Sequence, residues 1–246
     1  MPVTHQTQDS DPRRCVAITG ASGALGQALL RGWHRRGARL IALTSSQEPL
    51  RICGAEGAPI PLEQIHWQVG AEHQLAATFA VVDVLVLNHG VNVHGQRDAT
   101  ATALSLDVNA LSSWRLLELF AEGAAARPQG RCRPEVWVNT SEAEIEPAFS
   151  PLYEISKRLL GQLLSLRALD LGRQLRIRRL VLGPFRSALN PVGPMAAEFV
   201  AGQILLQARL GLNLIIVTPN PLVYLLMPLT VLGRWLYYRL LTRSGS

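Results

Sequence analysis

The segment CVAITGASGALG, residues 15–26, decides the fold of this chain. Its first five residues form a short run typical of a buried strand, and Gly20, Gly23 and Gly26 then lead into a helical pattern that continues to Arg36. Glycines at such a junction permit a tight turn, close approach of the backbone to a pyrophosphate, and close packing of helix on strand. The amides and dipole at the start of the helix favour an anion. The segment therefore predicts a dinucleotide-binding βα turn.

Short apolar strands alternate with helices along the rest of the chain. The pattern predicts further strands at residues 39–43, 65–69, 81–87, 135–139, 176–182 and 212–217, and helices at residues 72–79, 101–121, 151–171 and 195–209. Fully apolar strands separated by helices indicate a parallel sheet that is covered on both faces. We expect an α/β fold of the Rossmann type, a doubly wound parallel sheet of about seven strands in a single domain.

Composition narrows the class of protein further. The chain has 246 residues and a net charge of +6, with 48% apolar and 17% charged residues, which suits one well-buried globular domain. Four arginines within residues 173–179 lack interleaved aromatic residues, so we interpret them as a solvated face and expect no nucleic-acid partner. The three cysteines form no CxxC pair and the six histidines show no ligand spacing. We expect no metal site and a reducing, cytoplasmic setting.

Lys157 is the only lysine in the chain, and it follows Tyr153 by four residues. On a helix this spacing places both side chains on one face. An ammonium group is a compact charge with three rotatable donors, whereas arginine presents a wide planar fork. A neighbouring cation is expected to lower the pKa of a phenol and make it usable as a general acid or base. A solvated pair on an exposed helix is the alternative.

Five features in one order resemble the short-chain dehydrogenase/reductase family. They are the glycine turn TGASGALG at residues 19–26, Asn88-His89-Gly90, Asn109, Ser141, and Tyr153-x-x-x-Lys157. The resemblance covers residues 14–217. It implies a catalytic domain over residues 14–218. The polar N-terminus, which lacks the apolar core of a signal peptide, predicts a short disordered leader over residues 1–13, and residues 219–246 form an apolar C-terminal extension.

The resemblance implies a role for each matching residue. Tyr153 would exchange a proton with the substrate oxygen, and Lys157 would lower the pKa of Tyr153 and bind the nicotinamide ribose. Ser141 would hydrogen-bond the same substrate oxygen, although it could instead be a helix or turn cap, and Thr140 beside it is a rival. Asn109 would hold a water that links Lys157 to solvent, or mark a helix kink.

Cofactor contacts are expected from the turns at the carboxyl ends of the strands. The expected residues are Gly20, Ser22, Gly23, Ala24, Leu25, Gly26, Thr44, Ser45, Asn88, Gly90, Tyr153, Lys157, Pro184 and Ser187. The end of the second strand carries hydroxyls rather than an acid, which favours NADP(H) over NAD(H). His89 stands where the family usually has alanine, and its ring would lie near the cofactor or point to the surface.

These features predict an NADP(H)-dependent carbonyl reductase or alcohol dehydrogenase that acts on a small carbonyl or alcohol substrate, and the family implies a homodimer or homotetramer. A non-catalytic dinucleotide-binding sensor or scaffold is the alternative. An epimerase or dehydratase for nucleotide sugars is disfavoured, because too few residues follow Leu182 for the substrate domain of such enzymes.

The C-terminal extension carries no charge between Arg209 and Arg234. Prolines and asparagines interrupt this stretch, so a membrane span is not expected. Residues 222–241 place Trp and Tyr beside Arg, a pattern typical of a helix lying on a membrane surface. Such a helix would give peripheral membrane contact and suit an apolar or lipid-like substrate. A helix that covers the substrate pocket or packs across a dimer is equally favoured.

Overall fold

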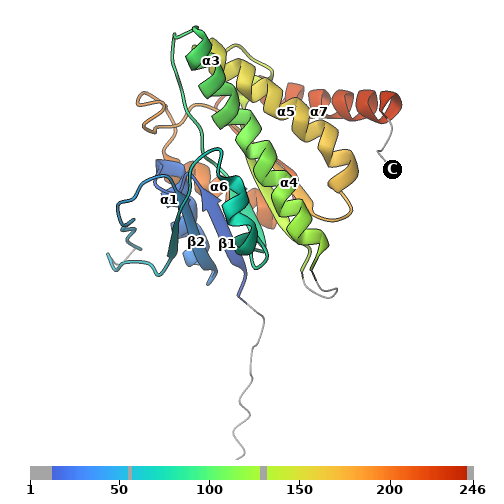
Figure 1. Cartoon of the computed structure of the whole chain (residues 1–246). Helices are drawn as coiled ribbons and strands as arrows, with labels where there is room; N and C mark the ends of the chain where they lie inside the picture. The colour runs from blue at the N-terminus through green and yellow to red at the C-terminus, as the bar shows by residue number, and fades with distance from the viewer. Residues whose placement is uncertain (1–12, 55–56, 128–131, 243–246) are drawn as a thin grey trace, which may run out of the picture.

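The computed structural model describes residues 13–54, 57–127 and 132–242. The leader expected over residues 1–13 lies almost wholly outside the described residues. A parallel sheet of seven strands forms the centre of the molecule, in the order β3-β2-β1-β4-β5-β6-β7 (Figure 1). The strands are β1 (Cys15–Thr19), β2 (Arg39–Thr44), β3 (Glu63–His66), β4 (Val84–Leu87), β5 (Glu135–Ser141), β6 (Arg176–Leu182) and β7 (Leu214–Val217). The expected Rossmann-type fold is confirmed.

Helices cover both faces of this sheet. They are α1 (Ala24–His34), η1 (Glu72–Leu75), α2 (Ala76–Phe79), α3 (Ala99–Leu106), η2 (Asp107–Leu111), α4 (Ser112–Ala125), η3 (Glu142–Glu144), α5 (Pro151–Leu171), α6 (Ala197–Arg209) and α7 (Pro221–Leu241). Helices α1 and α6 pack on one face, and α2, α4 and α5 pack on the other. Two apolar layers result, because alternate residues of each strand point to opposite faces.

Several elements differ from the expected boundaries. The third strand lies at Glu63–His66 rather than residues 65–69, and it pairs only with β2 at the edge of the sheet. The fourth strand begins at Val84 rather than residue 81, and the preceding Asp83 accepts a hydrogen bond from the amide of Cys15 at 2.9 Å.

The helix expected at residues 101–121 is longer and is interrupted by η2, so that α3, η2 and α4 together span residues 99–125. The fifth strand continues to Ser141, two residues beyond its expected end, and the seventh strand and α6 each begin two residues later than expected.

The last helix, α7, packs against α5 and β7 (Figure 1, red). Its buried residues Val223 and Met227 form a small apolar cluster with Val181 of β6 and Ile216 of β7. None of the helices in the described residues has the length and hydropathy that a bilayer crossing requires.

Candidate active site at the carboxyl edge of the sheet

The glycine turn joins β1 to α1 at the carboxyl end of the sheet. Gly20 has φ +61°, and a Cβ there would lie 2.9 Å from the Cα of His89. A Cβ on Gly26 would lie 2.3 Å from the carbonyl oxygen of Gly20. Side chains are therefore excluded at both positions, as the tight turn and the close packing of α1 require.

Helix α1 starts with an open N-terminus. Gly23 occupies its N-cap position without a side-chain hydrogen bond, and its first turn carries no acidic residue. The first amides of a helix have no partner within the helix, and the dipole adds partial positive charge. Together with the switch of strand order between β1 and β4, this geometry fits the pyrophosphate of a dinucleotide.

The ends of β1 and β4 are joined at this switch point through Thr19. The amide of Asn88 donates to Thr19 Oγ1 at 2.8 Å, and His89 Nδ1 lies 2.8 Å from the same oxygen. Burial, with a smaller effect of the Lys157 charge, lowers the pKa of His89 to about 4. The ring packs edge-on against Trp67. His89 is therefore a neutral ring that supports the turn, and it does not point to the surface.

Lys157 lies on α5 with its side chain buried. Its Nζ donates to the backbone carbonyl of Asn139 at 3.0 Å and lies 5.6 Å from the centroid of the Tyr153 ring. Burial lowers the pKa of Lys157 to about 8, and the negative charge of Glu144 opposes this effect. The ammonium thus faces the end of β5, and the alternative of a solvated pair on an exposed helix is wrong for the lysine.

Tyr153 sits one helical turn before Lys157, beside the end of β5. Burial raises the pKa of its phenol above the ordinary value, the Ser141 hydroxyl lowers it, and the charge of Glu142 raises it. The expected lowering of the pKa by Lys157 is therefore not seen, because removing the phenolate from water outweighs its favourable neighbours. In this state the phenol is protonated and can donate.

Ser141 ends β5 and also caps the short helix η3. Its Oγ accepts from the amide of Ala143 at 3.2 Å and lies 3.4 Å from the carbonyl of Leu182. The capping role considered from the sequence is thus present, and it fixes the hydroxyl beside Tyr153. Thr140 binds the carbonyl of Leu180 instead, so it does not replace Ser141 next to the phenol.

Asn109 lies in the π-helical turn η2 between α3 and α4. Its side chain is buried, accepts from the amide of Val91 at 2.8 Å, and donates to the carbonyl of Val91 and the hydroxyl of Ser156. Asn109 therefore ties the loop after β4 to α5 next to Lys157. The water relay implied by the family resemblance stays a prediction.

The remaining cofactor-site residues lie in the expected turns. Thr44 Oγ1 donates to Ser22 Oγ at 3.3 Å, and Ser22 and Ser45 are exposed. A Cβ on Gly90 would approach Asn109 Oδ1 to 3.1 Å. Pro184 follows β6, and Ser187 Oγ accepts from the amide of Asn190 within its own turn. Ala24 and Leu25 form the first turn of α1. The described residues include no group of three or more His, Cys, Asp or Glu side chains placed to hold a metal ion.

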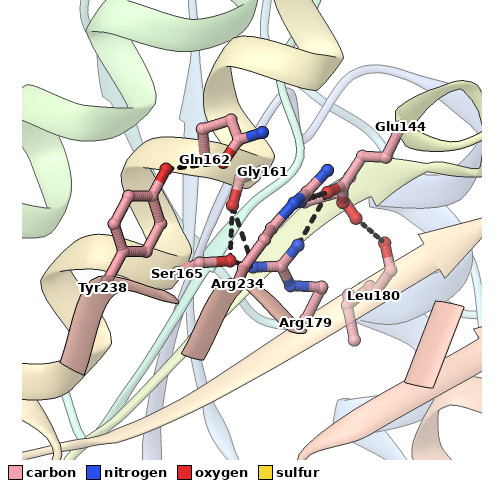
Figure 2. Close-up of polar contacts among 9 residues, drawn as sticks. Glu144, Gly161, Gln162, Ser165, Arg179, Leu180, Arg234 and Tyr238 are labelled. Atoms are coloured by element: carbon pink, nitrogen blue, oxygen red, sulfur yellow. Dashed lines mark hydrogen bonds and ion pairs between the residues drawn. The ribbon is translucent and has the colours of Figure 1, made fainter. Parts of the chain in front are cut away.

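A buried ionic cluster around Glu144 lies near the group formed by Ser141, Tyr153 and Lys157. Figure 2 shows Arg179 of β6 and Arg234 of α7 pointing at the Glu144 carboxylate from different sides, with Nη1–Oε2 distances of 2.7 and 2.6 Å. Arg179 also donates to the carbonyl of Gly161 and to Ser165 on α5. A Cβ on Gly161 would lie 1.8 Å from Glu144 Oε2, so only glycine leaves room for the carboxylate there.

The expectation that the arginines of residues 173–179 form a solvated face is wrong for two of them. Arg178 and Arg179 are 3% and 6% exposed rather than solvated. Arg178 Nε lies 2.7 Å from Glu135 Oε2, and Arg179 pairs with Glu144. Buried charges require such partners, and the partners lie 43 and 35 residues away in sequence, which sequence pattern alone does not reveal.

Three further polar groups hold the site and were not predicted from the sequence. Asn139 contacts Lys157 through its backbone carbonyl, so its side chain gives no signal. Ser156 would have been suggested by its position beside Lys157, one turn after Tyr153. Glu144 follows Ser141 by three residues, and its arginine partners come from β6 and α7, which are distant in sequence.

Solved structures with this fold are short-chain dehydrogenases. A short-chain dehydrogenase from Burkholderia cenocepacia in complex with NADP is 18% identical, with a TM-score of 0.73 over 94% of this chain and 98% of that one. A short-chain dehydrogenase from Sphingobium yanoikuyae in complex with NADPH is 15% identical, with a TM-score of 0.73 over 95% and 98% of the two chains. The resemblance inferred from the sequence is thus confirmed for the fold.

A curated protein of higher similarity is the monoglucosyldiacylglycerol epimerase of Synechocystis. It is 46% identical over 230 residues, which are 94% of this chain. The matched region spans 55% of the epimerase, so the chain covers about half the length of that relative. No protein-family model matches the chain.

Proposed function

We propose that the chain is an enzyme of the short-chain dehydrogenase/reductase family that inverts one carbinol centre in the sugar headgroup of a diacylglycerol glycolipid. The observation that carries the proposal is the convergence of Ser141, Tyr153 and Lys157 at the carboxyl edge of β5, beside the open N-terminus of α1. The similarity to a monoglucosyldiacylglycerol epimerase supports the substrate class.

A nicotinamide dinucleotide fits the residues at this edge. The amides of Ala24 and Leu25 would hold its pyrophosphate, and Lys157 would bind the nicotinamide ribose. Hydroxyls at Ser22, Thr44 and Ser45, in the absence of an acid at the end of β2, favour NADP(H) over NAD(H). The bound nicotinamide would accept a hydride from the carbinol carbon and later return it.

The protein supplies the proton transfers. Tyr153 would first release its phenolic proton to solvent, because the phenol is protonated at rest. The phenolate then takes the hydroxyl proton as the carbinol becomes a carbonyl, and the resulting phenol returns that proton when the carbonyl is reduced on the opposite face. Ser141 donates a hydrogen bond to the same oxygen, where negative charge develops. The ammonium of Lys157 stabilises the phenolate that forms transiently. Hydride and proton are both returned, so epimerisation has no net redox change.

A glycolipid epimerase needs no nucleotide-sugar domain after Leu182, because a glycolipid carries its sugar without a nucleotide. The short segment after Leu182 therefore disfavours only epimerases of nucleotide sugars. A carbonyl reductase or alcohol dehydrogenase remains the second candidate, supported by the NADP-bound structures with this fold. Stoichiometry separates the two: a reductase consumes one NADPH per product, whereas an epimerase turns over with catalytic dinucleotide.

The decisive experiment compares wild type with Tyr153→Phe. Monoglucosyldiacylglycerol in detergent is incubated with a trace of NADP⁺, and its epimer is quantified by chromatography. The variant lacks only the phenolic oxygen, so we expect turnover to fall by about 10²–10⁴ with dinucleotide binding retained in a fluorescence titration. Unchanged turnover would reject the assignment of Tyr153. Dinucleotide binding without turnover on any carbonyl or sugar lipid by wild type would favour the non-catalytic sensor or scaffold.

A further inference from the structure

Helix α7 presents an apolar surface that no described part of the chain covers. Its inward side is the narrow stripe of Val223, Met227, Val231, Arg234 and Tyr238, which repeats with the period of a helix. On the other sides, large apolar side chains are exposed, among them Leu222, Tyr224, Leu225, Leu226, Leu229 and Leu236. At 100° per residue these positions occupy more than half of the helix circumference. Apolar surfaces of this extent on a soluble domain mark an interaction site.

Few charges interrupt this surface. The helix contains two cations, Arg234 and Arg239, and no acidic residue. Arg234 is turned inward and pairs with Glu144, while the guanidinium of the exposed Arg239 lies 4.9 Å from the centroid of the Trp235 ring (Figure 2 for Arg234). Arg239 lines a surface hollow near the carboxyl end of the helix together with Arg167, Arg173 and Asp170, so cations predominate there. An apolar helix that ends in Trp, Tyr and Arg matches the acyl chains and phosphates of a lipid interface.

We propose that α7 lies in the surface of a lipid bilayer that contains anionic lipid. A second copy of the chain fits less well, because a partner helix buries one stripe of α7 whereas lipid surrounds the whole exposed circumference. The helix lies in the plane of the membrane, since its inward stripe stays packed on β6 and β7.

The start of α7 is joined to the candidate active site. Thr218, just before the helix, donates to Glu142 Oε2 at 2.5 Å, and Glu142 follows Ser141. Asn220 caps the helix and donates to the Glu146 carboxylate at 2.7 and 2.9 Å. A bilayer under α7 would therefore lie beside the site that receives the substrate. This link to substrate access rests on the proposed function, whereas the membrane surface itself rests on the exposure and charge of α7.

Vesicle binding tests the proposal without dinucleotide or glycolipid. The 246-residue chain is sedimented with vesicles of phosphatidylcholine, and with vesicles of equal parts phosphatidylcholine and phosphatidylglycerol. We expect it to partition onto both kinds of vesicle and more strongly onto the anionic ones, with that preference reduced by salt. The double variant Leu229→Glu/Leu236→Glu should bind roughly tenfold or more weakly, because two apolar groups are replaced by charges.

Leu210→Glu is the matched control. Leu210 is 69% exposed, more than either Leu229 or Leu236, but it follows α6 on the other side of the sheet. This variant should bind vesicles as wild type does, and all three proteins should share one circular dichroism spectrum.

Two outcomes would overturn the proposal. If wild type stays in the supernatant with both kinds of vesicle, α7 does not bind a membrane surface. A dimer in vesicle-free buffer that Leu229→Glu/Leu236→Glu converts to monomers assigns α7 to an interface between copies. Vesicle binding without epimerase activity would keep this inference and reject the proposed function, and activity in detergent without vesicle binding would do the reverse.

Discussion

Lys157 carries its charge in a position that is largely shielded from solvent. Its ammonium is buried, contacts a backbone carbonyl, and has a pKa lowered to about 8 by burial. Burial alone favours the neutral amine of Lys157. The negative charge of Glu144 acts in the opposite direction and favours the protonated ammonium. The unusual feature of the sequence, a single lysine among arginines, therefore corresponds to a site where the size and the protonation equilibrium of the cation both matter.

Lys157→Arg keeps the positive charge and changes its shape. The planar guanidinium is wider than the ammonium and has its donors in a fixed fork, so it cannot occupy the space between Asn139 O and Tyr153 without displacing one of them. We expect turnover to fall by about 10² or more, with the far-ultraviolet circular dichroism unchanged. An arginine variant with wild-type turnover would mean that any cation suffices at this position.

At the scale of elements, α5 was the most predictable part of the site. Its bounds, Pro151–Leu171, agree with the sequence prediction, because a proline sets the start and residues of helical pattern fill the next turns. Ser150 occupies the N-cap position, yet its hydroxyl binds the carbonyl of His94 rather than the helix. The position of a helix thus follows from local sequence, whereas the partners of its side chains depend on distant segments.

The junction of α5, β6 and α7 was not predictable for the same reason. Arg179 and Arg234 come from β6 and α7, whose positions the sequence pattern predicted, whereas Glu144 comes from η3, a short helix that was not predicted. Their mutual contact depends on how α7 folds back onto the sheet, and nothing local to any of the three residues encodes that. A run of arginines was therefore assigned to solvent when two of its members are buried.

Glu144→Gln should destabilise the fold strongly. The substitution removes the carboxylate that pairs with both Arg179 and Arg234, and breaking a buried ion pair costs about 3–5 kcal/mol. Glu198→Gln is the matched control, since Glu198 pairs with Arg31 at 2.6 Å but has an exposed side chain. That surface pair should contribute about 0–1 kcal/mol. Urea unfolding of both variants measures the loss of unfolding free energy. Equal losses would show that the buried cluster contributes no more to stability than the surface ion pair.

At the scale of the whole molecule, the ionisation of Glu72 makes the stability of the fold depend on pH. Burial acts to raise the pKa of Glu72, but hydrogen bonds from Arg115, Ser112 and the Gly70 amide outweigh it and lower the pKa to about 2. The ordinary value is 4.5, so the folded chain binds this proton less readily than the unfolded chain. The stabilisation that Glu72 contributes is complete above about pH 4.5 and is lost as the pH falls toward 2.

Glu72→Gln should therefore reduce the acid sensitivity of the fold. We expect the free energy of unfolding to fall as the pH is lowered from 4.5 to about 2, the interval between the ordinary and the folded-state pKa of Glu72, and to fall less in the variant than in wild type. Urea titrations at several pH values provide the measurement. Parallel pH curves for the two proteins would exclude Glu72 as a source of the dependence.

The π-helical turn at Asp107–Leu111 has a consequence for the evolution and engineering of this scaffold. A turn of this kind holds one more residue than a regular turn, so the extra residue is accommodated within the turn rather than by rotating α4 relative to α3. Removing a single residue would restore uninterrupted α-helix and withdraw the widened turn. Asn109 would then move away from Val91 and Ser156, and the loop after β4 would lose its tether. The number of residues in this segment is therefore constrained.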